Sequence, residues 1–248
     1  MREPERRPRA IVTGAGVRVG RAIATALARA GYDLVVHANR SREAVDEVAR
    51  ELEALGSRVS VETCDLADVR AVSDLAGRIR EAHGAVDLVV NNAAAYEHVP
   101  FSEIGPEAFE RMMAVNVRAP FFLVQGLLPA LRRAERPSIV NVTDACLRHA
   151  YSSGHTFAHY LASKAALEQL TLAWARELGP HVRVNAVAPG PVAIAGETSS
   201  AERDELFTRT PLGREGSAED VAEAVLYLAR APYVTGHVLA VDGGLGAS

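Results

Sequence analysis

A tyrosine and a lysine four residues apart are the side chains in this sequence best suited to acid–base chemistry. Tyr160 and Lys164 lie among good helix-forming residues, so their side chains project from the same helix face. A free tyrosine has a pKa of about 10 and exchanges protons poorly at neutral pH. The neighbouring ammonium is expected to favour the phenolate and to lower the pKa of Tyr160. The pair therefore predicts a proton-transfer site.

A glycine-rich segment near the N-terminus has the form of a phosphate-binding loop. The segment Thr13–Gly20 follows the apolar run Ala10–Val12 and precedes small residues with helical periodicity. A glycine loop between a strand and a helix lets backbone amides approach a pyrophosphate at the positive end of the helix. Glycines also form ordinary tight turns, but the flanking strand and helix favour a nucleotide site here.

The residues after the second predicted strand indicate which nicotinamide nucleotide would bind. NAD-binding sites place an acid there for the ribose 2′-hydroxyl, whereas NADP-binding sites offer an arginine. No acid occurs between Leu34 and Arg42, and the strand runs into His37, Arg40 and Ser41. Arg40 and Ser41 can hold a 2′-phosphate through charge-assisted hydrogen bonds. We expect NADP(H); the alternative is that the arginines only begin a solvated helix.

Short β-branched runs alternate with helical stretches along nearly the whole chain. Such alternation is typical of βαβ units, and the apolar strands suit a parallel sheet covered on both faces. We expect one Rossmann-type doubly wound α/β domain over residues 1–248, with about seven strands. The expected strands are Ala10–Val12, Asp33–His37, Val59–Thr63, Leu88–Asn91, Ile139–Val142, Arg183–Ala188 and Val238–Val241.

Two connections interrupt the alternation. Leu147–Phe157 is polar, and Pro189–Gly216 is long and rich in Gly, Pro, Ser and Thr. Both follow predicted strands, and ligands of open α/β sheets bind beyond the carboxyl ends of strands. These connections are therefore candidate substrate loops.

Composition excludes several other functions. The 248 residues are 48% hydrophobic and 23% charged, with a formal charge of −4 that offers no basic field for nucleic acid. The N-terminus lacks the apolar core of a signal peptide, and no apolar stretch approaches a membrane span. Cys64 and Cys146 are too few for a metal site or disulfide framework. We expect a cytoplasmic protein without metal, membrane or nucleic-acid partners.

The motifs, taken in order, resemble the short-chain dehydrogenase/reductase family. The glycine segment is similar to that family's T-G-x-x-x-G-x-G, except that Arg18 replaces the middle glycine. The remaining family-like pieces are Asp65-Leu66, Asn91-Asn92-Ala93-Ala94, Asn116, Tyr160 with Lys164, Pro189-Gly190 and Asp242-Gly243-Gly244. The resemblance extends over nearly the whole chain.

The resemblance implies an NADP(H)-dependent oxidoreductase acting on a small molecule. By this resemblance, Tyr160 exchanges a proton with the substrate, and Lys164 also binds the nicotinamide ribose. Asn116 is assigned a water that relays protons. The resemblance also implies a homotetramer that pairs the helices carrying Asn116 and Tyr160. The expected cofactor-binding residues are Gly14, Arg18, Val19, Gly20, His37, Arg40, Ser41, Asp65, Leu66, Asn92, Ala93, Tyr160, Lys164, Pro189, Gly190 and Val192.

The third catalytic residue of the family is altered. A serine is expected thirteen residues before the tyrosine, where this chain has Leu147. Counted from the fifth strand, the equivalent position is Asp144, sixteen residues before Tyr160, and a three-residue insertion would reconcile the counts. We favour Asp144; the alternative hydroxyls are Thr143, Ser152 and Ser153.

Three departures coincide, at Arg18, at the His37–Ser41 segment and at Asp144. Together they resemble the pteridine reductase branch of the family, in which an aromatic corresponding to Tyr96 stacks on the pterin. The implied substrate-binding residues are Arg18, Tyr96, Asp144 and Tyr160. The alternative is a 3-oxoacyl or polyketide ketoreductase. A non-catalytic NADP-binding regulator is more remote, because a sensor has no need of the Tyr160–Lys164 pair.

Overall fold

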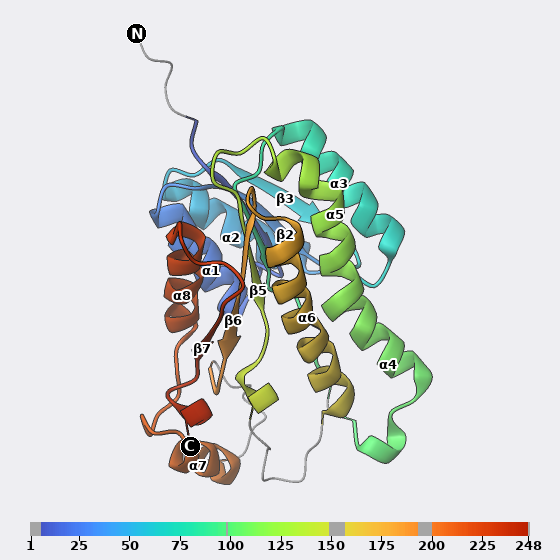
Figure 1. Ribbon diagram of the computed structural model, residues 1–248, viewed down its shortest axis with the longest axis vertical. Coiled ribbons are helices and arrows are strands. Elements are labelled where there is room, and N and C mark those ends of the chain that lie inside the picture. The colour runs from blue at the N-terminus through green and yellow to red at the C-terminus, as the bar shows by residue number, and fades with distance from the viewer. Residues whose placement is uncertain (1–5, 98, 149–156, 193–199, 248) are drawn as a thin grey trace.

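The predicted strands form one seven-stranded parallel sheet (Figure 1). The computed structural model describes residues 6–97, 99–148, 157–192 and 200–247. The strand order is β3-β2-β1-β4-β5-β6-β7, so the chain reverses direction across the sheet between β1 and β4. The strands are β1 (Arg9–Thr13), β2 (Asp33–Ala38), β3 (Val59–Thr63), β4 (Leu88–Asn91), β5 (Ser138–Val142), β6 (Arg183–Pro189) and β7 (Val238–Val241). Each predicted strand is present.

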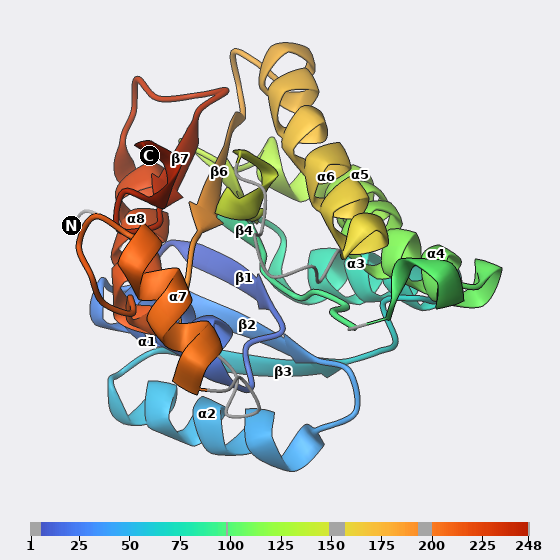
Figure 2. The ribbon, with the colours of Figure 1, turned by 90° about the horizontal axis from the view of Figure 1, so that it is seen from below.

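Helices cover both faces of the sheet, as the doubly wound prediction requires (Figures 1 and 2). One layer contains α1 (Arg18–Arg29), α2 (Arg42–Ala54) and α8 (Ala218–Arg230). The other contains α3 (Val69–His83), α4 (Pro106–Met113), α5 (Ala119–Leu131) and α6 (Ala158–Glu177). Because successive strand side chains point to opposite faces, Val12 packs under the first layer and Ile11 under the second.

The helices α4 and α5 are joined without a break by a π-helical segment, Ala114–Arg118. The continuous helix Pro106–Leu131 has the length and apolarity of a membrane-crossing helix, with a mean hydropathy of 1.3 over its most apolar window. By length and composition, this helix contradicts the expectation that no apolar stretch approaches a membrane span. Of that window, 56% is buried in the fold, as in a core helix.

The connection Pro189–Gly216, predicted as a substrate loop, includes regular structure. This connection contains α7 (Ser200–Arg209), which lies beyond the carboxyl ends of the strands at the bottom of Figure 1. The connection after β5 likewise begins with a short 3-10 helix, Ala145–Arg148. Residues 149–156 and 193–199, including the alternative hydroxyls Ser152 and Ser153, lie outside the described residues.

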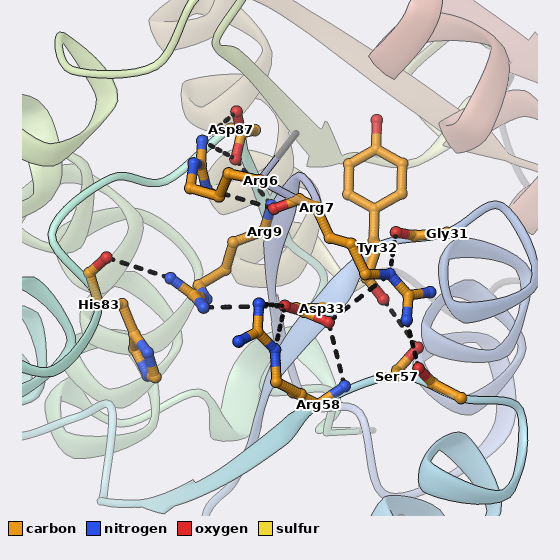
Figure 3. Close-up of polar contacts among 11 residues, drawn as sticks. Arg6, Arg7, Arg9, Gly31, Tyr32, Asp33, Ser57, Arg58, His83 and Asp87 are labelled. Carbon is orange, nitrogen blue, oxygen red and sulfur yellow. Dashed lines mark hydrogen bonds and ion pairs between the residues drawn. The ribbon is translucent and has the colours of Figure 1, made fainter. Parts of the chain in front are cut away.

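The opposite edge of the sheet, at the amino ends of the strands, carries a cluster of charges around Asp33 (Figure 3). The Asp33 side chain is 1% exposed and lies 2.7 Å from the Arg58 guanidinium. Arg7 and Arg9 approach the same carboxylate to 3.8 and 3.9 Å. The backbone amide of Arg9 donates to Asp87 at 2.7 Å, which ties β1 to the start of β4. These contacts join the amino ends of β1, β2, β3 and β4 at the edge remote from the glycine loop.

Candidate active site

Asp144, Tyr160 and Lys164 converge beyond the carboxyl end of β5. Asp144 follows that strand by two residues, and its Oδ2 accepts a hydrogen bond of 2.9 Å from the Tyr160 hydroxyl. Its Oδ1 accepts from the backbone amide of Cys146 at 2.8 Å, which fixes the carboxylate in a turn. The sixteen-residue spacing is therefore compatible with direct contact, as the strand-based count predicted. Leu147 lies in the 3-10 helix after the strand.

The electrostatic effect on Tyr160 is the reverse of the sequence prediction. Burial of the phenol and the adjacent Asp144 carboxylate raise the pKa of Tyr160 well above its ordinary value. The Lys164 ammonium lies 5.7 Å from the centre of the tyrosine ring, farther away than the carboxylate that accepts the phenol proton. Tyr160 is therefore held as a protonated phenol, a form that can donate a proton.

Lys164 is buried between α6 and β5. Its Nζ donates a hydrogen bond of 2.8 Å to the carbonyl oxygen of Val142. Burial lowers the pKa of Lys164 to about 8, partly offset by the Asp144 carboxylate. The charge of Lys164 can therefore change near physiological pH, while its hydrogen bond holds it against the strand that leads to Asp144.

Asn116 lies in the π-helical segment and binds two neighbouring elements. Its Oδ1 accepts from the amide of Ala95 at 2.7 Å, and its Nδ2 donates to Ala95 O at 3.0 Å and to Ser163 Oγ at 2.9 Å. Ser163 in turn donates to the carbonyl of Tyr160. Asn116 is therefore attached to α6 through Ser163, and the relay water implied by resemblance stays a prediction. Sequence analysis gave Ser163 no role, although its place between Tyr160 and Lys164 was the available signal.

An aromatic cluster forms one wall beside Tyr160. Tyr96 is 55% exposed and meets the Tyr160 ring edge-on, with centroids 5.0 Å apart. Phe157 is buried and lies 5.2 Å from the Tyr96 ring. Sequence analysis predicted Tyr96 but missed Phe157, which its position one helical turn before Tyr160 could have indicated.

The glycine loop is closed tightly over the end of β1. A Cβ atom on Gly20 would lie 2.0 Å from the carbonyl oxygen of Gly14, so a side chain cannot fit there. Asn92 Nδ2 donates to the carbonyls of Thr13 and Gly14 at 2.9 and 3.2 Å and holds the loop from β4. Arg18, in place of the usual glycine, has a φ of +50°, a left-handed conformation that is uncommon for a residue with a side chain.

At the end of β2 the residues change from buried to exposed. His37 is 1% exposed, and its Nε2 lies 3.2 Å from the carbonyl oxygen of Cys64, so its imidazole belongs to the sheet interior. Arg40 and Ser41 are exposed. Arg42 forms an ion pair with Asp46 at 3.2 Å, whereas Arg40 has no such partner among the described residues. Arg40 is thus the arginine here that is available to a phosphate.

Comparison with known proteins assigns the fold and motifs to a family. Residues 14–246 match the family model described as enoyl-(acyl carrier protein) reductase. The chain is 32% identical to 3-oxoacyl-[acyl-carrier-protein] reductase FabG of Thermotoga maritima, covering 95% of this chain and 96% of the relative. It is 33% identical to L-rhamnose 1-dehydrogenase (NAD(P)(+)) of a Sphingomonas species, covering 95% and 94%.

A solved structure described as a short-chain dehydrogenase/reductase of the glucose/ribitol dehydrogenase type, from Brucella melitensis, superposes with a TM-score of 0.84. It is 32% identical to this chain and covers 96% of each protein. The chain belongs to the short-chain dehydrogenase/reductase family. As a short-chain dehydrogenase/reductase it is an oxidoreductase that uses a nicotinamide cofactor.

The residues of this short-chain dehydrogenase/reductase fit such a cofactor. The first turn of α1 has neither an acidic residue nor a side-chain cap, so its amides are open to a pyrophosphate. Asp65 Oδ1 accepts from the amide of Ala67 at 2.9 Å, which orders the turn after β3, and Leu66 is buried there. The other predicted contacts, Val19, Ala93, Pro189, Gly190 and Val192, lie at or beyond the carboxyl ends of β1, β4 and β6.

Proposed function

We propose that this protein is an NADPH-dependent reductase of reduced pterins, such as dihydropterins. The observation that carries the proposal is the hydrogen bond between Tyr160 and Asp144 at 2.9 Å, with a carboxylate in the place of the family serine. A carboxyl group can take up and pass on a proton, which suits reduction of a ring C=N bond. NADPH supplies the hydride for such a reduction.

The chain's own residues supply the proton and the binding surface. Tyr160, held protonated, donates its proton to the ring nitrogen, and Asp144 is the adjacent group through which the phenol can recover one. Tyr96 offers a half-exposed ring for a flat heterocycle, and stacking of this kind adds about 0.5–1.5 kcal/mol beyond area burial. Burial raises the pKa of Tyr96 to about 12, so its hydroxyl remains a hydrogen-bond donor. Arg18, at the mouth of the glycine loop, is exposed and can reach the polar rim.

Purified protein and NADPH would be assayed with a dihydropterin and, separately, with a 3-oxoacyl thioester. Pterin reduction is expected, and Tyr96→Ala should raise the pterin KM by roughly threefold to tenfold through the lost stacking, while NADPH affinity stays unchanged. Phe101→Ala, at a 73% exposed aromatic, is a matched control that should leave both constants unchanged. Reduction of the thioester alone would instead establish the ketoreductase alternative, which the likeness to FabG supports.

The preference for NADPH over NADH forms part of the proposal. It rests on Arg40, which is exposed without an acidic partner among the described residues. Arg40→Glu removes one charge-assisted contact, worth about 1.5–3 kcal/mol, and adds a repulsive charge. NADPH affinity should fall at least about tenfold, with NADH affinity little changed; Arg42→Glu, whose arginine is already paired with Asp46, is the control. Equal losses for both nucleotides would contradict the preference.

We also propose that the protein assembles as a homo-oligomer through the outer faces of α4, α5 and α6. An open apolar groove runs between these helices, lined by Met113, Val117, Phe121, Ala166, Leu170 and Ala173. A second copy would present the same groove in a two-fold pairing. Light scattering should then give a multiple of the 26.4 kDa chain mass, and a monomer at micromolar concentration would argue against it.

A further inference from the structure

We propose that Asn91, Asn141 and Thr171 act together as positioning residues that fix the catalytic helix against the cofactor-binding edge of the sheet. The proposal rests on the proposed reductase function, but it concerns residues that touch neither the cofactor nor the substrate. Its basis is a chain of buried side-chain hydrogen bonds that crosses from β4 through β5 to α6.

The chain consists of two consecutive amide-donated bonds. Asn91 Nδ2 donates to Asn141 Oδ1 at 2.8 Å, and Asn141 Nδ2 donates to Thr171 Oγ1 at 2.9 Å. Asn91 and Asn141 are paired residues on adjacent strands, so the first bond runs straight across the sheet. All three side chains are at most 3% exposed. Thr171 also donates to the carbonyl of Leu167, one turn earlier in α6.

Each end of this series of hydrogen bonds lies next to a part of the active site. Asn91 immediately precedes Asn92, whose side chain holds the carbonyls of Thr13 and Gly14 in the glycine loop. Asn141 immediately precedes Val142, whose carbonyl accepts the hydrogen bond from Lys164. Two bonds therefore fasten α6 to β5, one at Thr171 and one almost two turns earlier at Lys164. Together they fix the position of α6 along β5, and hence the position of Tyr160 relative to the glycine loop.

Stability alone does not account for this arrangement. Asn91 Oδ1 is buried and has no hydrogen-bond partner among the described residues. A buried acceptor without a partner costs free energy, whereas an apolar residue of similar size would avoid that cost. The core on these two strands is otherwise largely apolar, with Val89 of β4 and Ile139 of β5 fully buried. Polar groups that cost stability yet define a unique geometry are expected where register matters to function.

The test replaces Thr171 by valine, which keeps the shape but removes the hydroxyl that receives the Asn141 amide. The matched control is Ser57→Ala, which removes another buried hydroxyl bond, to Tyr32 O at 2.7 Å, at the remote edge of the sheet. Thr171→Ser restores the hydroxyl and is the rescue variant. For each protein, kcat, KM and the NADPH dissociation constant are measured well below the melting temperature. The pH profiles of kcat and of the NADPH dissociation constant are measured as well.

Thr171→Val is expected to lower kcat by roughly ten- to a hundredfold, because small displacements far from the chemistry carry penalties of that size. The fall of activity and of NADPH binding that accompanies neutralisation of Lys164, at a pH of about 8 in the parent protein, should shift. Thr171→Ser should recover most of the loss. Ser57→Ala should lower the melting temperature without changing kcat or the NADPH dissociation constant.

The proposal is overturned if Thr171→Val only lowers the melting temperature, or if Ser57→Ala reproduces its kinetic effects. NADPH binding separates this outcome from failure of the proposed function. If the parent protein reduces no pterin or oxoacyl substrate, the pterin proposal fails, while the effect of Thr171→Val on NADPH affinity and its pH profile still decides the positioning role.

Discussion

Asp33 and Asp144 lie at opposite edges of the same sheet, and their partners differ in kind. Asp33, at the amino end of β2, is covered by the guanidinium groups of Arg58, Arg7 and Arg9 (Figure 3). Asp144, beyond the carboxyl end of β5, is half-buried and pairs with the neutral hydroxyl of Tyr160. One carboxylate is surrounded by permanent positive charge, and the other shares a hydrogen bond with a group that can exchange its proton.

The difference affects the titration of each cluster in opposite ways. Burial alone would raise the pKa of Asp33, but hydrogen bonds from the Arg58 amide and guanidinium, with the charges of Arg58 and Arg7, outweigh it and lower that pKa. Burial and Asp144 together raise the pKa of Tyr160. The first cluster is therefore fixed in one charge state near neutrality, as a stabilising element should be. The second retains a transferable proton.

Asp144→Asn should produce a large effect, and that effect should appear in catalysis. Asparagine can still accept from the Cys146 amide, so the turn after β5 is preserved and stability should change by less than about 1 kcal/mol. Loss of the carboxylate should lower kcat by about 10²–10⁴-fold, the usual contribution of a general acid–base group. Steady-state kinetics and thermal melting of the same samples provide the measurement.

Tyr160→Phe is the reference variant for this comparison. It removes the proton donor itself, so its loss of kcat should equal or exceed that of Asp144→Asn, with NADPH binding nearly intact. Near-parental kcat in either variant would remove that residue from the catalytic assignment. A large loss of stability in Asp144→Asn would make the two carboxylates alike and end the contrast.

The sheet was predictable because its signals are local. The central strands are short runs buried on both faces, as in the fully buried β2 and β4, whereas β3 and β7 are only partly buried. The glycine loop and the Tyr160–Lys164 spacing are likewise fixed by neighbouring residues in the chain. The position of Asp144 followed from where β5 ends, although the residue count from Tyr160 was unusual.

The remainder depends on contacts between distant segments. The pKa of Tyr160 was predicted to fall because only Lys164 is adjacent in sequence. Burial is the largest cause of the rise and the Asp144 carboxylate adds to it, and both depend on packing against other elements. Burial of His37 against Cys64 depends on the register between β2 and β3. The helix α7 was missed because its segment lacks a strong apolar stripe. The arginine cluster around Asp33 was also missed, since its members come from three separate segments.

Asp33→Asn should produce the smaller effect, and it should appear in stability rather than catalysis. The substitution keeps the shape of the side chain but replaces a charge-assisted bond from Arg58 by a neutral one, and it leaves three arginines around an uncharged group. A loss of about 2 kcal/mol is expected, which for a domain of this size lowers the melting temperature by about 4–8 °C. The exposed pair Arg42–Asp46 supplies the control, because Asp46→Asn should cost under about 0.5 kcal/mol.

Since the pKa of Asp33 is lowered on folding, its contribution to stability is complete above the unfolded-state pKa of about 3.9 and is lost as the pH falls through the folded value. Melting curves of the parent and Asp33→Asn proteins should therefore differ at pH 7 and converge under acid, with kcat at pH 7 unchanged. Equal melting temperatures at pH 7, or a kcat reduced as far as in Asp144→Asn, would show that the two edges of the sheet are not divided between stability and chemistry.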